Sequence, residues 1–203
     1  MPQTTRVRLS TETRQAEIIA AVLQLSAKRS PALITTGDIA SAVALTQGAV
    51  FRHFPSKDAI WLAVMEWVES NLLSSLESAA QTAPDPLAGM QAIFMAHVGF
   101  VMKHPGVPRI IFSELQLPDE TPLKIRVRGI LERYQQLLMQ QLGAAGKCGQ
   151  IDPSIDKAGA AMLFIGTVQG LVMQSMLSGS SERMNSDAAR VFLLYRNALR
   201  SGS

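Results

Sequence analysis

The sequence predicts an all-α protein of about nine helices, and two observations support this class. Apolar residues recur every three to four positions along most of the 203-residue chain, which is the spacing that gives a helix one apolar face. No stretch alternates apolar and polar residues in the manner of a half-buried strand. We therefore expect helices throughout, in a small N-terminal domain (residues 1–55) and a larger C-terminal domain (residues 56–203).

The first two helices have recognisable ends. Apolar spacing places the first at residues 12–28, and Pro31 follows it. Thr35 and Asp38 have the spacing of a capping box, in which two side chains satisfy the free amides of a helix start. A short second helix is therefore expected directly after Thr35.

A third short helix is expected from residue 47 to about residue 54. Thr46 can cap its start, and Pro55 ends it. Two short capped helices separated by three or four residues are typical of a helix-turn-helix, which here occupies residues 35–54.

Six further helices are expected after residue 55. Ser56 caps a long helix that ends before Pro84 and joins the two domains. The next helix is broken at residues 104–108 by two prolines and a glycine. The remaining expected helices lie at about 87–101, 108–112, 127–138, 154–177 and 188–199.

The excess positive charge is concentrated near the N-terminus. Residues 1–60 carry seven basic and four acidic side chains, a net charge of +3, whereas the rest of the chain carries 12 of each. A small basic module beside a neutral body is typical of a polyanion-binding protein. Arg6, Arg8 and Arg14 form either a basic arm for DNA or an ordinary disordered terminus.

Residues 36–58, TGDIASAVALTQGAVFRHFPSKD, closely resemble the N-terminal signature of the TetR family of bacterial repressors. Over residues 85–203 the likeness extends only to length and helical character. The resemblance implies a homodimeric, sequence-specific regulator of transcription, and specifically a repressor that a small molecule releases from its operator.

Two positions depart from the family pattern. Ala44 stands where the turn usually has a glycine, so a positive φ there would cost roughly 1 kcal/mol. Phe51 stands where relatives have an aromatic hydroxyl that often contacts a phosphate. That contact is therefore absent or replaced in this chain.

The second helix of the helix-turn-helix has the residue types needed to read DNA. Thr46 offers a hydroxyl and the positive end of the helix dipole to a phosphate. Gln47 can pair with an adenine edge, and Arg52 can reach a guanine or the backbone. Gly48 and Ala49 keep this helix slim enough for close approach.

Three further positions match phosphate-contacting positions of the family, namely Thr36, His53 and Lys57. Such contacts set affinity and its salt dependence. The alternative for Lys57 is a solvated cation at a helix start. The predicted DNA-binding residues are Thr36, Thr46, Gln47, Gly48, Phe51, Arg52, His53 and Lys57.

The segment 158–173 is apolar on every face and so must be covered on every side. We expect a homodimer in which the helices at 154–177 and 188–199 pair with their symmetry mates, with Gly166 and Gly170 allowing close approach. The alternative is the central helix of a large monomer. A twofold protein implies a palindromic operator in double-stranded DNA.

The ten methionines of the chain suggest an adaptable interior. Together with aromatic residues, they could line a cavity for a small apolar or amphipathic effector, or they could simply form ordinary core. His97 and Gln169 are the polar groups on the same helical faces, and His97 could equally be a core histidine. The expected ligand-binding residues are Phe94, His97, Met102, Phe112, Tyr134, Met162 and Gln169.

Other classes of protein are disfavoured. The three histidines are scattered and no catalytic or nucleotide-binding motif occurs, so we expect neither an enzyme nor a cofactor. The single cysteine, Cys148, allows no internal disulfide and no zinc cluster. No transmembrane helix or signal peptide is expected, which favours the cytoplasm and no membrane partner. The remaining rival is a helical adaptor for protein partners, which would show no salt-sensitive affinity for DNA.

Overall fold

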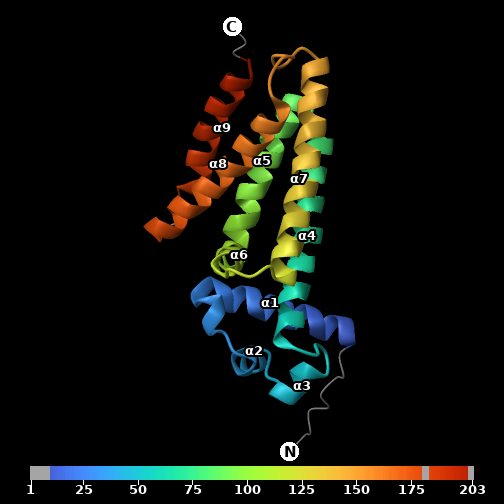
Figure 1. The fold of residues 1–203 in the computed structure, drawn as a ribbon, viewed down its shortest axis with the longest axis vertical. Helices are drawn as coiled ribbons and strands as arrows, with labels where there is room; N and C mark the ends of the chain where they lie inside the picture. Colours follow the sequence, from blue (N-terminus) through green and yellow to red (C-terminus); the bar gives the residue numbers. More distant parts are fainter. Residues whose placement is uncertain (1–9, 180–182, 201–203) are drawn as a thin grey trace, which may run out of the picture. The chain divides into compact units, whose positions relative to one another are not determined.

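The computed structural model describes residues 10–179 and 183–200 of the chain (Figure 1). These residues contain nine α-helices, one short 3-10 helix and no strand. The all-α class predicted from the apolar spacing is therefore confirmed. Arg6 and Arg8 of the expected basic arm lie outside the described residues.

The chain divides into two compact units, neither of which is continuous in sequence. The first contains residues 10–67 and 105–124, and the second contains residues 68–104 and 125–200. The division into a DNA-binding domain at residues 1–55 and an effector domain at residues 56–203 stays a prediction.

The first unit is built from α1 and the helix-turn-helix, with α6 added from later in the sequence. Its elements are α1 (Thr11–Lys28), η1 (Pro31–Leu33), α2 (Thr36–Ala42), α3 (Gln47–Phe51), the start of α4 (Lys57–Thr82), and α6 (Gly106–Leu115). Buried aliphatic side chains from these helices share one core, including Val22, Ile39, Val50 and Ile60.

Side-chain caps start α2 and α4, as the sequence indicates. The hydroxyl of Thr35 accepts from the amide of Asp38 at 3.1 Å, and the carboxylate of Asp38 accepts from the amide of Thr35 at 2.8 Å. Ser56 caps α4 by accepting from the amide of Ala59 at 3.0 Å. These bonds satisfy amides that have no partner within their helices, so both caps are confirmed.

Helix α6 packs directly against α1, and a glycine makes this possible. A Cβ at position 106 would overlap the carbonyl oxygen of Leu23 and lie 3.0 Å from the amide nitrogen of Ala27. Gly106 therefore lets the backbones of the two helices approach without intervening side chains. The sequence predicted the break before α6 but not this pairing.

The second unit is a bundle of longer helices. It contains most of α4, α5 (Pro86–Lys103), most of α7 (Pro122–Lys147), α8 (Lys157–Ser178) and α9 (Met184–Arg200). Helix α7 begins at Pro122, earlier than the apolar spacing suggested, because Thr121 accepts from the amide of Lys124 at 3.1 Å and a proline suits the first helical position.

Polar contacts join the helices of this bundle. Glu69 on α4 binds Arg126 at 2.9 Å and Arg133 at 2.8 Å, both on α7. Burial raises the pKa of Glu69, but the two arginines outweigh this effect and lower its pKa overall. The hydroxyl of Tyr195 on α9 donates to the carbonyl oxygen of Ala160 on α8 at 3.0 Å.

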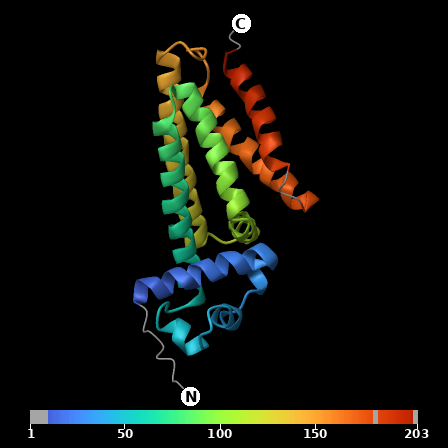
Figure 2. The same cartoon turned by 180° about the vertical axis from the view of Figure 1, so that it is seen from behind.

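Helices α8 and α9 lie side by side (Figure 2). Together they leave a set of large apolar side chains exposed. On α8, Phe164 and Val168 are buried inside the unit. By length and composition alone α8 could cross a membrane, whereas the apolar run in the sequence predicted no transmembrane helix. A third of its most apolar window is buried within the protein, and core helices of soluble proteins pass the same test. Its apolar residues serve the bundle on one side and stay exposed on the other. The exposed apolar residues of the two helices are Met162, Leu163, Met173, Leu177, Leu193 and Leu194.

Candidate DNA-binding site

The start of α3 is exposed and capped. The hydroxyl of Thr46 accepts from the amide of Ala49 at 3.2 Å, and Gln47 and Gly48 are exposed beside it. Helix α3 ends at Phe51, three residues earlier than expected. It ends there because the chain turns at His53, whose amide donates to the carbonyl oxygen of Val50 at 2.9 Å.

The turn between α2 and α3 is a Schellman motif with an alanine in the left-handed position. Ala44 has a φ of 52°. The amide of Leu45 donates to the carbonyl oxygen of Ala40 at 2.8 Å, and that of Ala44 donates to Ser41 at 3.2 Å. The positive φ anticipated for this position is present, so the turn carries the strain expected of an alanine there.

The predicted contacts at the end of α3 differ in their surroundings. Phe51 and Arg52 are exposed, and Phe51 has no hydroxyl to offer a phosphate. His53 is half-buried, and its carbonyl oxygen accepts from the side chain of Gln15 at 3.0 Å. Lys57 is also half-buried, with its ammonium 5.9 Å from the ring centre of Trp61.

The first turn of α2 lies next to Gln47. Thr36 is the first residue of α2, and the amide nitrogen of the Gln47 side chain lies 2.7 Å from the place that a Cβ on Gly37 would take. Sequence reasoning missed this approach. Gly37 could have indicated this approach, because glycine is a poor helix former and its presence in the first turn of a short helix suggests that another group needs the space.

Within the first unit the structure therefore brings together Thr36, Thr46, Gln47, Gly48 and Arg52, on and beside the two short helices of the helix-turn-helix. An exposed helix start with a hydroxyl, a carboxamide and a guanidinium nearby can contact phosphates and base edges.

Comparison with protein families supports the same assignment. The model of the bacterial regulatory proteins of the tetR family matches residues 18–64. The model of the tetracyclin repressor-like C-terminal domain matches residues 118–191. The chain belongs to the TetR family. Regulators of this family bind DNA and small-molecule ligands, act as dimers and are not enzymes.

Individual relatives of this TetR-family chain are distant. The nucleoid occlusion factor SlmA of Marinomonas sp. is 24% identical over 78% of this chain and 81% of its own length. The fatty acid degradation regulator FadR from Bacillus halodurans has a TM-score of 0.83 at 17% identity, covering 97% of this chain and 100% of its own. FadR from Bacillus subtilis, solved with stearoyl-CoA, has a TM-score of 0.80 at 16% identity over 91% of this chain and 99% of its own.

The interior of the second unit holds an aromatic cluster in this TetR-family protein. The rings of Phe94 and Phe164 are 5.1 Å apart and nearly perpendicular, and Tyr134 packs against Phe164 at 6.2 Å. Nδ1 of His97 lies 3.2 Å from the hydroxyl of Tyr134. Burial lowers the pKa of His97 to about 4 and raises that of Tyr134, so both side chains are neutral at pH 7.

The other predicted ligand-binding residues do not join this cluster. Phe112 belongs to α6 in the first unit, whereas the cluster lies in the second. Met162 and Gln169 are exposed on α8, since their side of that helix faces away from the core. Met102 is half-buried near the end of α5. Helical spacing indicated which residues are apolar but not which side of α8 faces the core.

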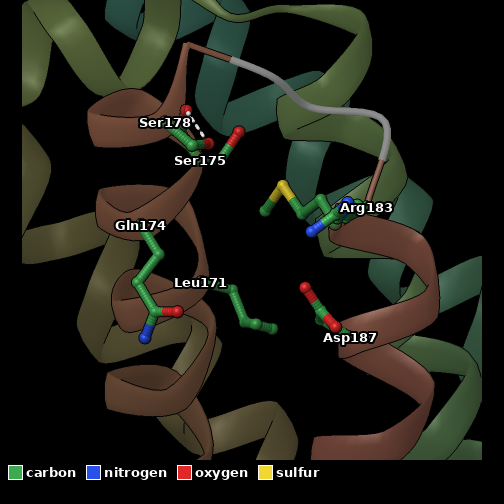
Figure 3. Close-up of a pocket in the computed structure, with 7 residues that line it drawn as sticks. Leu171, Gln174, Ser175, Ser178, Arg183 and Asp187 are labelled. Carbon is green, nitrogen blue, oxygen red and sulfur yellow. Dashed lines mark hydrogen bonds between the residues drawn. The ribbon is translucent and has the colours of Figure 1, made fainter.

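A separate pocket of about 430 Å³ lies between the end of α8 and the start of α9. In Figure 3, Leu171 and Asp187 point toward one another across it, with Arg183 beside them. The hydroxyl of Ser178 donates to the carbonyl oxygen of Ser175 at 3.1 Å. None of the lining residues was predicted from the sequence to bind a ligand, and all of them except Leu171 lie outside the apolar segment 158–173. They are Leu171, Gln174, Ser175, Ser178, Arg183, Met184 and Asp187.

Proposed function

We propose that this chain is a cytoplasmic transcriptional repressor that binds a palindromic operator as a homodimer and is released by a small apolar or amphipathic effector. The observation that carries the proposal is the exposed, capped start of α3, where Thr46 and Gln47 stand with Arg52 one turn further on. This arrangement suits insertion of α3 into a major groove.

We assign base reading mainly to Gln47 and Arg52, because a carboxamide pairs with adenine and a guanidinium with guanine. Thr36, Thr46, His53 and Lys57 are assigned to phosphates, with Gly48 allowing close approach. Phe51 is exposed and has no hydroxyl, so we assign it an apolar contact with a deoxyribose of the DNA backbone or with a thymine methyl group.

The proposed dimer interface is the uncovered face of α8 and α9. Met162 is 70% exposed, Leu177 81% and Leu194 69%, although all three are large apolar side chains. Exposed apolar patches of this kind mark interaction sites, and a second copy of the same face would cover them. Met162→Glu should therefore yield monomers in sedimentation experiments, whereas Met139→Glu, at an exposed methionine of α7, should leave the dimer intact.

The proposed effector site is the region around the aromatic cluster and the neighbouring faces of α5, α7 and α8. Phe94, Tyr134 and His97 offer apolar surface and a polar pair that can orient a ligand. An effector would release DNA only if it binds more tightly to a form of the dimer that cannot bind the operator.

The decisive experiment is selection of bound sequences from a random duplex pool at low and near-physiological salt. A palindrome retained at the higher salt is expected. Gln47→Ala should reduce discrimination among sequences, and Lys57→Ala should weaken all duplexes alike and flatten the salt dependence. Gln24→Ala and Lys28→Ala, at exposed positions of α1, serve as matched controls. If no motif is recovered and no salt-sensitive binding occurs, the protein is an adaptor rather than a regulator.

A second candidate function is nucleoid occlusion, which is named for the SlmA proteins of Marinomonas sp. and Alteromonas mediterranea. The observation that favours it is the extent of the likeness to the latter, 26% identity over 85% of this chain, which is not confined to the helix-turn-helix. Mapping of bound sites across the chromosome separates the two functions. A few sites at promoters support the repressor, and many dispersed sites support nucleoid occlusion.

A further inference from the structure

The side chain of Gln47 lies over the first turn of α2. Its amide nitrogen is 2.7 Å, and its amide carbon 3.8 Å, from the place of a Cβ on residue 37. Real Cβ contacts do not come this close, so the carboxamide of Gln47 occupies space that only a glycine at position 37 leaves open.

The conformation of α2 gives no other reason for a glycine here. Among the described glycines, positive φ values occur at Gly149 and Gly179 and not at Gly37. Gly37 is the second residue of α2, where alanine is the better helix former. Space for the neighbouring side chain, and not backbone geometry, is therefore what position 37 provides.

The first turn of α2, over which the Gln47 side chain lies, is held in a fixed conformation. The capping box of Thr35 and Asp38 closes the first turn of α2, and Arg29 binds the carboxylate of Asp38 at 2.8 Å. These hydrogen bonds lower the pKa of Asp38, so its carboxylate is ionised at pH 7. The backbone of the first turn of α2 therefore has a fixed position beside Gln47.

We propose that Gly37 is a positioning residue for base recognition: it leaves the space in which the carboxamide of Gln47 rests and so fixes the direction from which that group meets a base. The inference rests on the proposed function, in which Gln47 reads DNA. Pairing with adenine needs the oxygen and nitrogen of the carboxamide in one plane with the base edge, so a displaced carboxamide reads that base less well.

Gly37→Ala tests the proposal without threatening the fold. The methyl group would clash only with the far end of the exposed Gln47 side chain, since its distance of 3.5 Å to the hydroxyl oxygen of Thr35 is an ordinary contact. Gln47 therefore swings away while α2 gains a better helix former. Gly99→Ala on α5 is the matched control, because a Cβ there meets nothing within 4 Å. Both full-length variants should unfold at or slightly above the wild-type temperature.

The readout is base preference in the random duplex pool. Gly37→Ala should lower discrimination about fivefold or more at the positions that Gln47→Ala also affects, with the salt dependence unchanged. In a Gln47→Ala background it should have no further effect, as a double-mutant cycle requires for residues that act through one another. Wild-type preferences in Gly37→Ala, or an equal effect in both backgrounds, overturn the proposal.

A measurement without DNA separates this inference from the proposed function. In the free wild-type protein, nuclear Overhauser contacts are expected between the side-chain amide protons of Gln47 and the α-protons of Gly37. Their absence overturns the positioning role even if the protein selects a motif. If the contacts are present but wild-type protein selects no motif, the proposed function fails, and the role in base recognition fails with it.

Discussion

The alanine at the turn of the helix-turn-helix should make this protein less stable than it could be. Ala44 occupies the left-handed position of the Schellman motif with a φ of 52°. Its Cβ then crowds the following carbonyl group, at a cost of about 1–2 kcal/mol that a glycine does not incur. Ala44→Gly removes this crowding and keeps both hydrogen bonds of the turn, because they are made by backbone atoms.

The net gain is smaller than the strain, because glycine also loses more freedom on folding, by about 0.5–1 kcal/mol relative to alanine. We expect Ala44→Gly to raise the free energy of unfolding by about 0.5–1 kcal/mol. With a denaturant slope of roughly 2 kcal/mol per molar urea, the unfolding midpoint rises by about 0.3–0.5 M. Protein concentration must be equal in all samples, since dimerisation contributes to stability.

Ala20→Gly is the control, because it makes the same replacement at an exposed position inside α1. It should lower the free energy of unfolding by about 1 kcal/mol. The opposite signs separate relief of strain from a general effect of glycine. If Ala44→Gly destabilises the protein as Ala20→Gly does, the turn is not strained and the explanation is refuted.

Three further predictions concern caps, ion pairs and pH, each measured by urea unfolding. Thr35→Ala removes one half of the capping box and should cost about 1 kcal/mol, and Thr35→Ser should restore most of it. Glu69→Gln breaks the ion pairs with Arg126 and Arg133 and should cost about 1 kcal/mol at pH 7. Because folding lowers the pKa of Glu69, this difference is present above its ordinary pKa of 4.5 and should vanish as the pH falls below it. His97 has a pKa lowered from 6.5 to about 4, so the unfolded chain takes up its proton first and stability should fall between pH 6.5 and 4. A pKa difference of this size corresponds to a loss of about 3 kcal/mol in the free energy of unfolding. Because His97 keeps some contact with solvent, we expect a loss of about 2 kcal/mol. His97→Gln should lack this loss, and an unchanged slope in that variant would contradict the assignment.

Local signals predicted the helix-turn-helix closely. The starts of α2 and α3 follow from Thr35, Asp38 and Thr46, whose side chains bond to amides only three residues away. The strain at Ala44 could also be predicted from the sequence, because it depends on the conformation of a single turn. Such features are determined within a few residues of chain, where sequence patterns are most informative.

Packing contacts between residues that are distant in the sequence could not be predicted in the same way. Apolar spacing marked α8 as hydrophobic throughout, yet nothing in it shows that Phe164 faces inward and Met162 outward. The approach of Gln47 to Gly37 joins two helices, as does that of Gly106 to α1. The 3-10 turn at residues 31–33 was likewise not anticipated.

The placement of α6 has a consequence for protein engineering. The simplest design of a chimeric regulator would exchange one continuous N-terminal segment. In this protein a segment that ended within α4 would leave behind α6, whose Val107 and Ile110 are buried in the same compact unit as α1. A donor helix in place of α6 would also need a glycine where Gly106 meets Leu23. A workable exchange should therefore carry residues 105–124 along with the helix-turn-helix, as two grafted pieces instead of one.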